Sequence, residues 1–269
     1  MRVFKALMLA AMASVGLVEA SDTPLEELTT GDAARPWEAV GRLDIGGSGF
    51  CTGALISDTH VLTAAHCLYA KGSGERIDPA LIEFRAGWRN GRAGAYRMVR
   101  RAVEHPDYQF TAEASTDRVR NDVAILELVH PIRNGRITPF AIAERPRKGA
   151  RVGVVSYAAN RSEAPSLQQA CRVMARQLGM LVLSCDVDFG SSGAPVFTFE
   201  TGVPRIASVI SAKAEVEGQP VSLGTGLESQ VTDLMSELAA GKGVHQVPPP
   251  QIRRVGETNT ALGAKFVRP

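Results

Sequence analysis

Three short motifs in this sequence combine residue types that suit nucleophilic chemistry. Residues 62–67 (Leu-Thr-Ala-Ala-His-Cys) carry a histidine, and residues 121–126 (Asn-Asp-Val-Ala-Ile-Leu) open an apolar strand with an acid. Residues 190–195 (Gly-Ser-Ser-Gly-Ala-Pro) form a turn of small residues. A serine hydroxyl is a weak nucleophile at neutral pH, so it needs an imidazole to accept its proton. A buried carboxylate orients that imidazole, and His66, Asp122 and Ser192 therefore supply the types that acyl transfer requires.

The small-residue turn also suits the binding of an oxyanion. A tetrahedral intermediate needs N–H donors that are held in place before the reaction begins. Gly190 and Gly193 flank Ser192 and permit the backbone conformations of such a tight turn. Each motif alone has an ordinary structural explanation. Their joint occurrence in the order His, Asp, Ser is what indicates a catalytic site.

Short strands are the elements that must position these residues. The chain has 26 Gly and 15 Pro among 269 residues, which is typical of a turn-rich fold. About a dozen β-type segments are predicted, with no long helices between them, at residues 39–45, 52–57, 60–63, 81–86, 96–103, 123–128, 151–157, 169–175, 180–185, 194–199, 206–211 and 221–226. This pattern favours all-β barrels over a parallel α/β sheet. One helix is predicted at 228–240, where apolar residues recur at helical spacing and Gly241 follows.

The composition excludes several classes of protein. With 45% hydrophobic and 22% charged residues, the chain resembles an average soluble globular protein and not a disordered, collagen-like or multi-span membrane protein. The formal net charge of +2 gives no support for a nucleic-acid partner. The length suits one large all-β domain or two small barrels packed together.

The two ends of the chain are expected to lie outside the fold. Residues 1–20 combine basic residues, an apolar run over 6–18 and a small-residue exit, which predicts a secretory signal peptide cleaved after Ala20. A short membrane anchor or a buried helix is the alternative. Residues 21–36 are polar and predict an N-terminal arm or propeptide, and residues 242–269 predict a disordered tail. We therefore expect a secreted or periplasmic protein with no membrane contact after cleavage.

Export makes disulfides the expected state of the four cysteines. None forms a Cys-x-x-Cys pair and no histidine has zinc-finger spacing, so no structural metal is expected. Three pairings are possible. The sequence-local one, Cys51–Cys67 with Cys171–Cys185, would close two short loops worth about 3 kcal/mol each in the chain-entropy model. Free buried thiols are the alternative.

Over roughly residues 37–240, these motifs resemble the chymotrypsin-like (trypsin-like) serine endopeptidases. Residues 62–67, 121–124 and 190–195 match the histidine, aspartate and serine motifs of that family, and 105–108 resembles the segment that often precedes its aspartate. Residues 51–56 match the strand whose cysteine pairs with the one after the histidine. The resemblance implies an all-β fold of two packed six-stranded antiparallel Greek-key barrels with a C-terminal helix. Residues 37–145 would form the first barrel, and residues 146–241 the second barrel and the helix.

The resemblance also implies a role for each site residue. His66 would be the base, Asp122 its orienter and Ser192 the nucleophile, with the backbone N–H groups of Gly190 and Ser192 as the oxyanion hole. Cys51 would pair with Cys67, leaving Cys171 to pair with Cys185. The expected activity is hydrolysis of proteins or peptides through an acyl-enzyme, by a monomer that needs no cofactor or metal.

Two departures from the family pattern affect activation. The family's serine motif usually has Asp before the serine, where it pairs with a newly released N-terminus, but Ser191 stands there in this chain. No Ile-Val-Gly-Gly-like start precedes Trp37. The pattern is closer to bacterial glutamyl-endopeptidase-like relatives. We therefore predict that activity does not depend on a new N-terminus, because a buried ammonium without a charged partner would be poorly solvated.

Substrate preference is less determined by the sequence. Asp186 lies six residues before Ser192, where trypsins carry the acid that binds basic side chains, so it is the candidate for a specificity pocket. The alternative is a structural Asp bonded to nearby backbone. Ile210 stands where glutamyl-specific enzymes often have His, which argues against acidic substrates.

Three other functions fit the sequence less well than an endopeptidase does. A non-catalytic serine-protease-like binding protein usually lacks a member of the triad, and this chain has all three. An α/β-hydrolase needs Gly-x-Ser-x-Gly and the order Ser, Asp, His, whereas Ala194 replaces the last Gly here. A zinc peptidase needs a His-Glu-x-x-His helix, which the five histidines do not supply.

Overall fold

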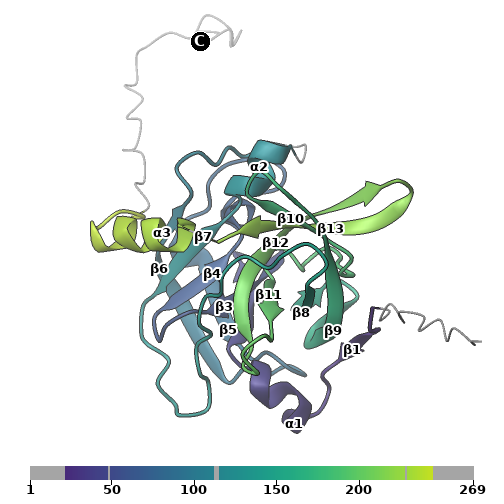
Figure 1. Cartoon of the computed structure of the whole chain (residues 1–269). Helices are drawn as coiled ribbons and strands as arrows, with labels where there is room; N and C mark the ends of the chain where they lie inside the picture. Colours follow the sequence, from purple (N-terminus) through teal and green to yellow (C-terminus); the bar gives the residue numbers. More distant parts are fainter. Residues whose placement is uncertain (1–21, 48, 112–114, 228, 245–269) are drawn as a thin grey trace, which may run out of the picture.

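The computed structural model describes residues 22–47, 49–111, 115–227 and 229–244. Its strands form two antiparallel barrels that lie against each other (Figure 1). The expected signal peptide at 1–20 lies outside the described residues, as does all but the first three residues of the expected tail. No helix in the described part of the chain is long and apolar enough to span a membrane.

The first barrel is closed by six strands that pair in the order β2-β3-β4-β7-β6-β5. Every strand pair in it is antiparallel. Its interior is filled by alternate apolar side chains, such as Leu43, Leu62, Phe84 and Leu126, which are at most 1% exposed. The strands are β2 (Val40–Ile45), β3 (Phe50–Leu55), β4 (His60–Thr63), β5 (Ile82–Ala86), β6 (Ala95–Glu104) and β7 (Ala124–Leu128).

The second barrel pairs its strands in the order β9-β10-β13-β12-β11-β8, and a pairing between β8 and β9 closes the ring. Its strands are β8 (Arg151–Ala158), β9 (Arg161–Gln177), β10 (Met180–Leu183), β11 (Pro195–Thr198), β12 (Arg205–Val216) and β13 (Gln219–Gly226). The expected fold of two six-stranded antiparallel barrels is confirmed. Two strands extend well beyond the predicted ends. The outer end of β12 is largely exposed, and the first half of β9 has three consecutive buried residues, 164–166, one of them Pro165, so neither segment shows the alternation that marks a half-buried strand.

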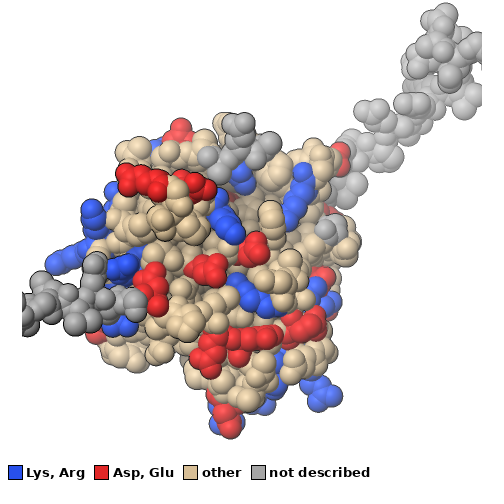
Figure 2. All heavy atoms as spheres, turned by 90° about the vertical axis from the view of Figure 1, so that its right-hand side faces the viewer, with Lys and Arg blue, Asp and Glu red and all other residues tan. Residues whose placement is uncertain are grey.

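The N-terminal arm docks on the second barrel. Strand β1 (Leu25–Glu27) pairs with β9, and the next residue, Leu28, is 4% exposed. The short helix α1 (Gly31–Ala34) follows, capped by the Thr30 hydroxyl, and the 3-10 turn η1 (Arg35–Trp37) leads into the first barrel. On the face of the molecule that Figure 2 shows, which is the right-hand side of Figure 1, positive and negative side chains are interspersed, in keeping with the small net charge.

The helices lie at the edges of the barrels. Helix α3 (Gln230–Ala239) follows the second barrel in sequence but packs on β6 and β7 of the first (Figure 1). Its Leu234 and Leu238 enter the core cluster, and Arg101 of β6 donates to the carbonyl of Leu238 at 3.1 Å. Helix α2 (Thr116–Asn121), with Ser115 as its N-cap, was not predicted because six residues are too few to show a helical period.

Two disulfides join neighbouring elements of each barrel. Cys51–Cys67 links β3 to the 3-10 turn η2 (Ala65–Leu68), and Cys171–Cys185 links β9 to the segment that follows β10. These are the sequence-local pairs. The 3-10 turn η3 (Pro79–Leu81) leads into β5.

Candidate active site

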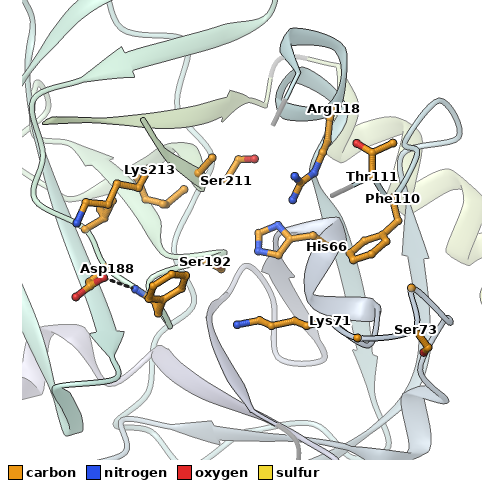
Figure 3. Close-up of a pocket in the computed structure, with 16 residues that line it drawn as sticks. His66, Lys71, Ser73, Phe110, Thr111, Arg118, Asp188, Ser192, Ser211 and Lys213 are labelled. Atoms are coloured by element: carbon orange, nitrogen blue, oxygen red, sulfur yellow. Dashed lines mark hydrogen bonds between the residues drawn. The ribbon is translucent and has the colours of Figure 1, made fainter. Parts of the chain in front are cut away.

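A cleft of about 750 Å³ has side chains from both barrels on its walls. His66 and Ser192 line it together, with the guanidinium of Arg118 near the imidazole and Lys71 on the opposite side (Figure 3). Lys213 of β12 also lines the cleft, so the described lining residues include three cationic side chains, those of Lys71, Arg118 and Lys213. Among the described residues that line the cleft, Asp188 is the acidic one.

Strand pairing brings His66 and Asp122 to the same end of the first barrel. Thr63, the last residue of β4, pairs with Ala124, the first residue of β7. Because the two strands are antiparallel, the residues after Thr63 and before Ala124 emerge side by side. His66 follows in η2, and Asp122 is the C-cap of α2.

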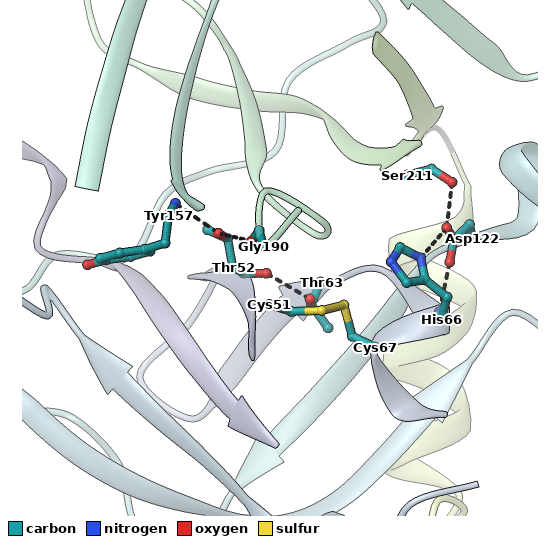
Figure 4. Close-up of a disulfide and its surroundings, with 9 residues drawn as sticks. All are labelled: Cys51, Thr52, Thr63, His66, Cys67, Asp122, Tyr157, Gly190 and Ser211. Carbon is teal, nitrogen blue, oxygen red and sulfur yellow. Dashed lines mark hydrogen bonds and ion pairs between the residues drawn. A yellow bond between two sulfur atoms is a disulfide. The ribbon is translucent and has the colours of Figure 1, made fainter. Parts of the chain in front are cut away.

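The carboxylate of Asp122 holds His66 at two points. Its Oδ2 lies 2.7 Å from the imidazole Nδ1, and its Oδ1 accepts from the backbone N–H of His66 at 2.9 Å (Figure 4). Asp122 is fully buried. Because a carboxylate can only accept, Nδ1 carries the proton in this bond, and the neutral ring therefore offers Nε2 as its proton acceptor.

Sequence reasoning missed two residues of the second barrel that contact Asp122 and the turn before it. The Ser211 hydroxyl on β12 donates to the carboxylate at Asp122 Oδ2, at 2.5 Å. The Thr225 hydroxyl on β13 donates to the backbone carbonyl of Val119 at 2.6 Å and lies 3.1 Å from the backbone carbonyl of Asp122. Both side chains are at least 95% buried. Nothing in the local sequence distinguishes them from other small polar residues in strands, so only the packing of one barrel on the other reveals them.

The turn that carries Ser192 is held by its own backbone bonds. Ser191 N–H donates to the Asp188 carbonyl, Ala194 N–H donates to the Ser191 carbonyl, and Gly193 N–H donates to the Ile210 carbonyl. The N–H groups of Gly190 and Ser192 form no hydrogen bond with another described residue. These are the two donors expected for the oxyanion.

Glycine is required at position 193. Its φ is +76°, a value that side chains disfavour. A Cβ there would lie 2.1 Å from Thr63 Oγ1 and 2.4 Å from the Thr52 carbonyl oxygen. Backbone and buried side chain therefore leave no room for a methyl group, and this close approach seats the turn of the second barrel directly on β3 and β4 of the first.

Thr52 of β3 connects the Ser192 turn to both barrels, and it too was missed. Its hydroxyl donates to the Gly190 carbonyl at 2.9 Å and accepts from the Tyr157 N–H at 3.1 Å (Figure 4). Its own N–H donates to the Ser192 carbonyl at 2.8 Å. Thr52 is fully buried. It lies next to the disulfide at Cys51, so one short stretch of β3 contacts both the serine turn and the element that carries His66.

No hydrogen bond between the Ser192 hydroxyl and His66 occurs in the described structure, although both line the cleft. Such bonds are commonly long in the absence of substrate and tighten when it binds.

The Cys51, His66 and Cys67 ligand atoms lie within 4.8 Å of one another, but both sulfurs are in a disulfide and offer no thiolate to a metal.

The expected specificity residue lies elsewhere. Asp186 is exposed and is not among the residues that line the cleft, and its N–H donates to the Gln168 side chain at 2.7 Å. Val187 and Ile210 line the cleft instead, as does Phe189, which is 77% exposed. The Lys71 ammonium lies 5.7 Å from the centre of the Phe189 ring, so a cation–π pair connects the two barrels at the cleft.

The comparisons with known proteins agree with one another. The model of the family described as Trypsin matches residues 29–221. Trypsin from Phaedon cochleariae is 40% identical over 84 residues, which are 31% of this chain and 29% of that protein. Cathepsin G from Mus musculus is 33% identical over 99 residues, which are 36% of this chain and 33% of that protein. The chain thus spans a third or less of the length of these relatives.

A solved structure described as a Glu endopeptidase in complex with MPD shares the fold. It superimposes with a TM-score of 0.65 at 16% identity, over 83% of this chain and all of that one. At this identity the likeness concerns the arrangement of the two barrels.

Proposed function

Because the chain belongs to the trypsin family of chymotrypsin-like serine proteases, we propose that it is an exported endopeptidase that hydrolyses proteins or peptides through Ser192, His66 and Asp122. One observation carries the proposal. The buried Asp122 carboxylate holds both Nδ1 and the backbone N–H of His66, and the same imidazole faces a cleft that Ser192 also lines.

The first half of the reaction forms an acyl-enzyme. Ser192 Oγ attacks the carbonyl carbon of the substrate while its proton passes to His66 Nε2. Asp122 stabilises the imidazolium that results and keeps its ring in place. The imidazolium then gives the proton to the amine of the peptide, which leaves as the C–N bond breaks.

The second half returns the enzyme to its starting state. His66 takes a proton from water, which attacks the ester carbonyl, and the proton then returns to Ser192 Oγ as the C–O bond to the enzyme breaks. In both halves the negative charge on the carbonyl oxygen is bound by the N–H groups of Gly190 and Ser192. These donors are free of other partners among the described residues, which supports the assignment.

Export is part of the proposal. Disulfides persist in oxidising compartments, so Cys51–Cys67 and Cys171–Cys185 fit a secreted or periplasmic protein. We expect the full chain, expressed in a bacterium, to leave the cytoplasm and to carry Ser21 as its first residue in mass spectrometry. Retention in the cytoplasm with an intact N-terminus would contradict export while leaving the catalytic proposal standing.

Replacement of Ser192 tests the activity. Ser192→Ala should retain the thermal unfolding midpoint, lose nearly all peptide hydrolysis and no longer react with a fluorophosphonate probe, because no activated hydroxyl remains. Ser236→Ala is the matched control, since Ser236 is an exposed serine on α3 that bonds only its own helix. A wild-type protein that neither cleaves peptides nor reacts with the probe would favour the non-catalytic binding protein.

A further inference from the structure

We propose, on the basis of the proposed function, that Arg161 is a positioning residue that holds the oxyanion turn in its active shape from within the chain. The guanidinium bonds the side chain of Ser191, which lies between the two residues whose N–H groups bind the oxyanion. This contact does not require a newly released N-terminus.

Arg161 bridges β8 and the turn. It is the first residue of β9, directly after the hairpin from β8, and it is only partly exposed. Its Nη1 donates to the Ser156 carbonyl at 2.7 Å. Its Nη2 donates to the Ser156 hydroxyl at 3.1 Å and to the Ser191 hydroxyl at 3.2 Å. Both nitrogens of this rigid planar group therefore donate to Ser156 of β8, and Nη2 also donates to the turn, which fixes the spacing between the two.

The contact also orients the hydroxyl of Ser191, which is fully buried. Because a guanidinium can only donate, the Ser191 oxygen must accept from it, and the oxygen also accepts from the Asp188 N–H at 3.3 Å. The hydroxyl proton is then free for the Tyr157 carbonyl at 3.2 Å. Three separate segments therefore meet at one oxygen atom.

A fixed Ser191 constrains both oxyanion donors. The N–H of Ser192 belongs to the peptide group that Ser191 begins. The N–H of Gly190 lies in the segment between Asp188 and Ser191. Two hydrogen bonds close this segment: the Asp188 N–H donates to the Ser191 hydroxyl, and the Ser191 N–H donates to the Asp188 carbonyl. If the Ser191 side chain loses its anchor, these peptide groups can rotate and the two N–H groups no longer converge.

Three acidic side chains surround the guanidinium of Arg161. Burial lowers the pKa of Arg161, and the negative charges of Asp186, Asp188 and Glu27 offset part of this effect. Glu27 lies on β1, so the docked arm contributes to the environment of the guanidinium through a side chain and not through a terminal amine.

The test compares Arg161→Ala and Arg161→Lys with Arg97→Ala. Arg97 is a matched control, because it is a partly exposed arginine that bonds backbone carbonyls, at residues 96, 130 and 131, on the far strand β6. For Arg161→Ala we expect kcat on a peptide substrate to fall about 10- to 100-fold, below the cost of removing an oxyanion donor outright. KM should change less than about threefold, and a peptidyl aldehyde, whose adduct places an oxyanion at the turn, should bind more weakly in proportion to kcat.

Two further readouts separate positioning from simple support of the fold. Arg161→Lys should restore part of kcat, and methylguanidine in the buffer should raise the kcat of Arg161→Ala but not that of Arg97→Ala. If Arg161→Ala does not fold, Ser191→Ala serves instead, because it removes the acceptor and leaves the bonds of Arg161 to Ser156 in place; it should show the same loss of kcat.

Unchanged kcat in a folded Arg161→Ala, or in Ser191→Ala where that variant replaces it, overturns the proposal. An equal loss of kcat in Arg97→Ala, or a loss that methylguanidine does not reverse, overturns it as well. These outcomes require an active wild-type enzyme. If the wild type is inactive and does not react with the fluorophosphonate probe, it is the proposed function that fails.

Discussion

Thr52→Val removes one buried hydroxyl while nearly preserving the shape of the side chain. The hydroxyl bonds the Gly190 carbonyl and the Tyr157 N–H, at 2.9 and 3.1 Å, and the variant leaves both groups buried without that partner. A typical buried hydrogen bond contributes about 1 kcal/mol net, and an unpaired buried group costs roughly 1–3 kcal/mol. We therefore expect the free energy of unfolding to fall by about 2–4 kcal/mol.

The same substitution should lower kcat, because the Gly190 carbonyl belongs to the turn that presents Ser192. A displacement of about 1 Å at a reacting group can cost about 100-fold in rate, so a partial displacement should cost roughly 10-fold or more. The bond from the Thr52 N–H to the Ser192 carbonyl remains in the variant, which limits the displacement.

Urea unfolding followed by tryptophan fluorescence measures the first quantity, since Trp37 and Trp88 are both buried. Peptide hydrolysis gives the second. Ser208→Ala is the matched control, because its buried hydroxyl makes one bond, to the Thr225 carbonyl at 2.7 Å, away from the turn. It should cost about 1 kcal/mol and leave kcat unchanged. If Thr52→Val is no less stable than Ser208→Ala, or keeps the wild-type kcat, the assignment of Thr52 as the link between β3 and the turn is refuted.

Four further perturbations give distinct expectations. Ser211→Ala removes a donor to the buried Asp122 carboxylate, so kcat should fall about 10- to 100-fold with the fold retained; an unchanged kcat would contradict a role for this bond. The double substitutions Cys51/Cys67→Ala and Cys171/Cys185→Ala should each lower the free energy of unfolding by about 3 kcal/mol in denaturant, because the two disulfides close loops of similar length. The first should lower kcat more, since it frees the turn that carries His66. Burial lowers the pKa of His60 below 6.5, so the folded state binds this proton more weakly than the unfolded state, and the free energy of unfolding decreases as pH falls below 6.5. In urea titrations, His60→Gln should reduce this dependence of stability on pH, and the rest should remain because the pKa of His105 is lowered in the same way. Extending the exported chain by a few residues before Ser21 should leave kcat unchanged, and a large loss that specific proteolysis reverses would show that a terminal amine is needed after all.

Much of the local structure could be predicted from the sequence, because its causes are local. Strand β4 (His60–Thr63) has the predicted bounds, and most other strands differ by only a few residues, since alternation and turn residues mark their ends. The motifs around His66, Asp122 and Ser192 could be found in the same way, because the chemistry needs particular residue types in short, well-defined turns.

The partners of those motifs depend on contacts between distant segments. Ser211 and Thr52 form hydrogen bonds with residues that lie 89 and 138 positions away in the sequence. Thr225 and Arg161 likewise contact residues on other elements of the fold. Helix α3 has a predictable amphipathic period, but the period does not indicate that it packs on the barrel that precedes its own. Asp186 has the spacing of a pocket residue, yet its side chain is exposed outside the cleft.

The physical reason is that residue type and spacing determine what a side chain can do, whereas its partner is determined by register and packing. His66 can accept a proton wherever it lies, but only the pairing of β4 with β7 sets it beside Asp122. A buried hydroxyl such as that of Ser211 must find a partner, because leaving it unpaired costs free energy, and many carbonyls and carboxylates could serve. The docking of the two barrels selects one of them, and in this protein it selects the carboxylate that orients His66.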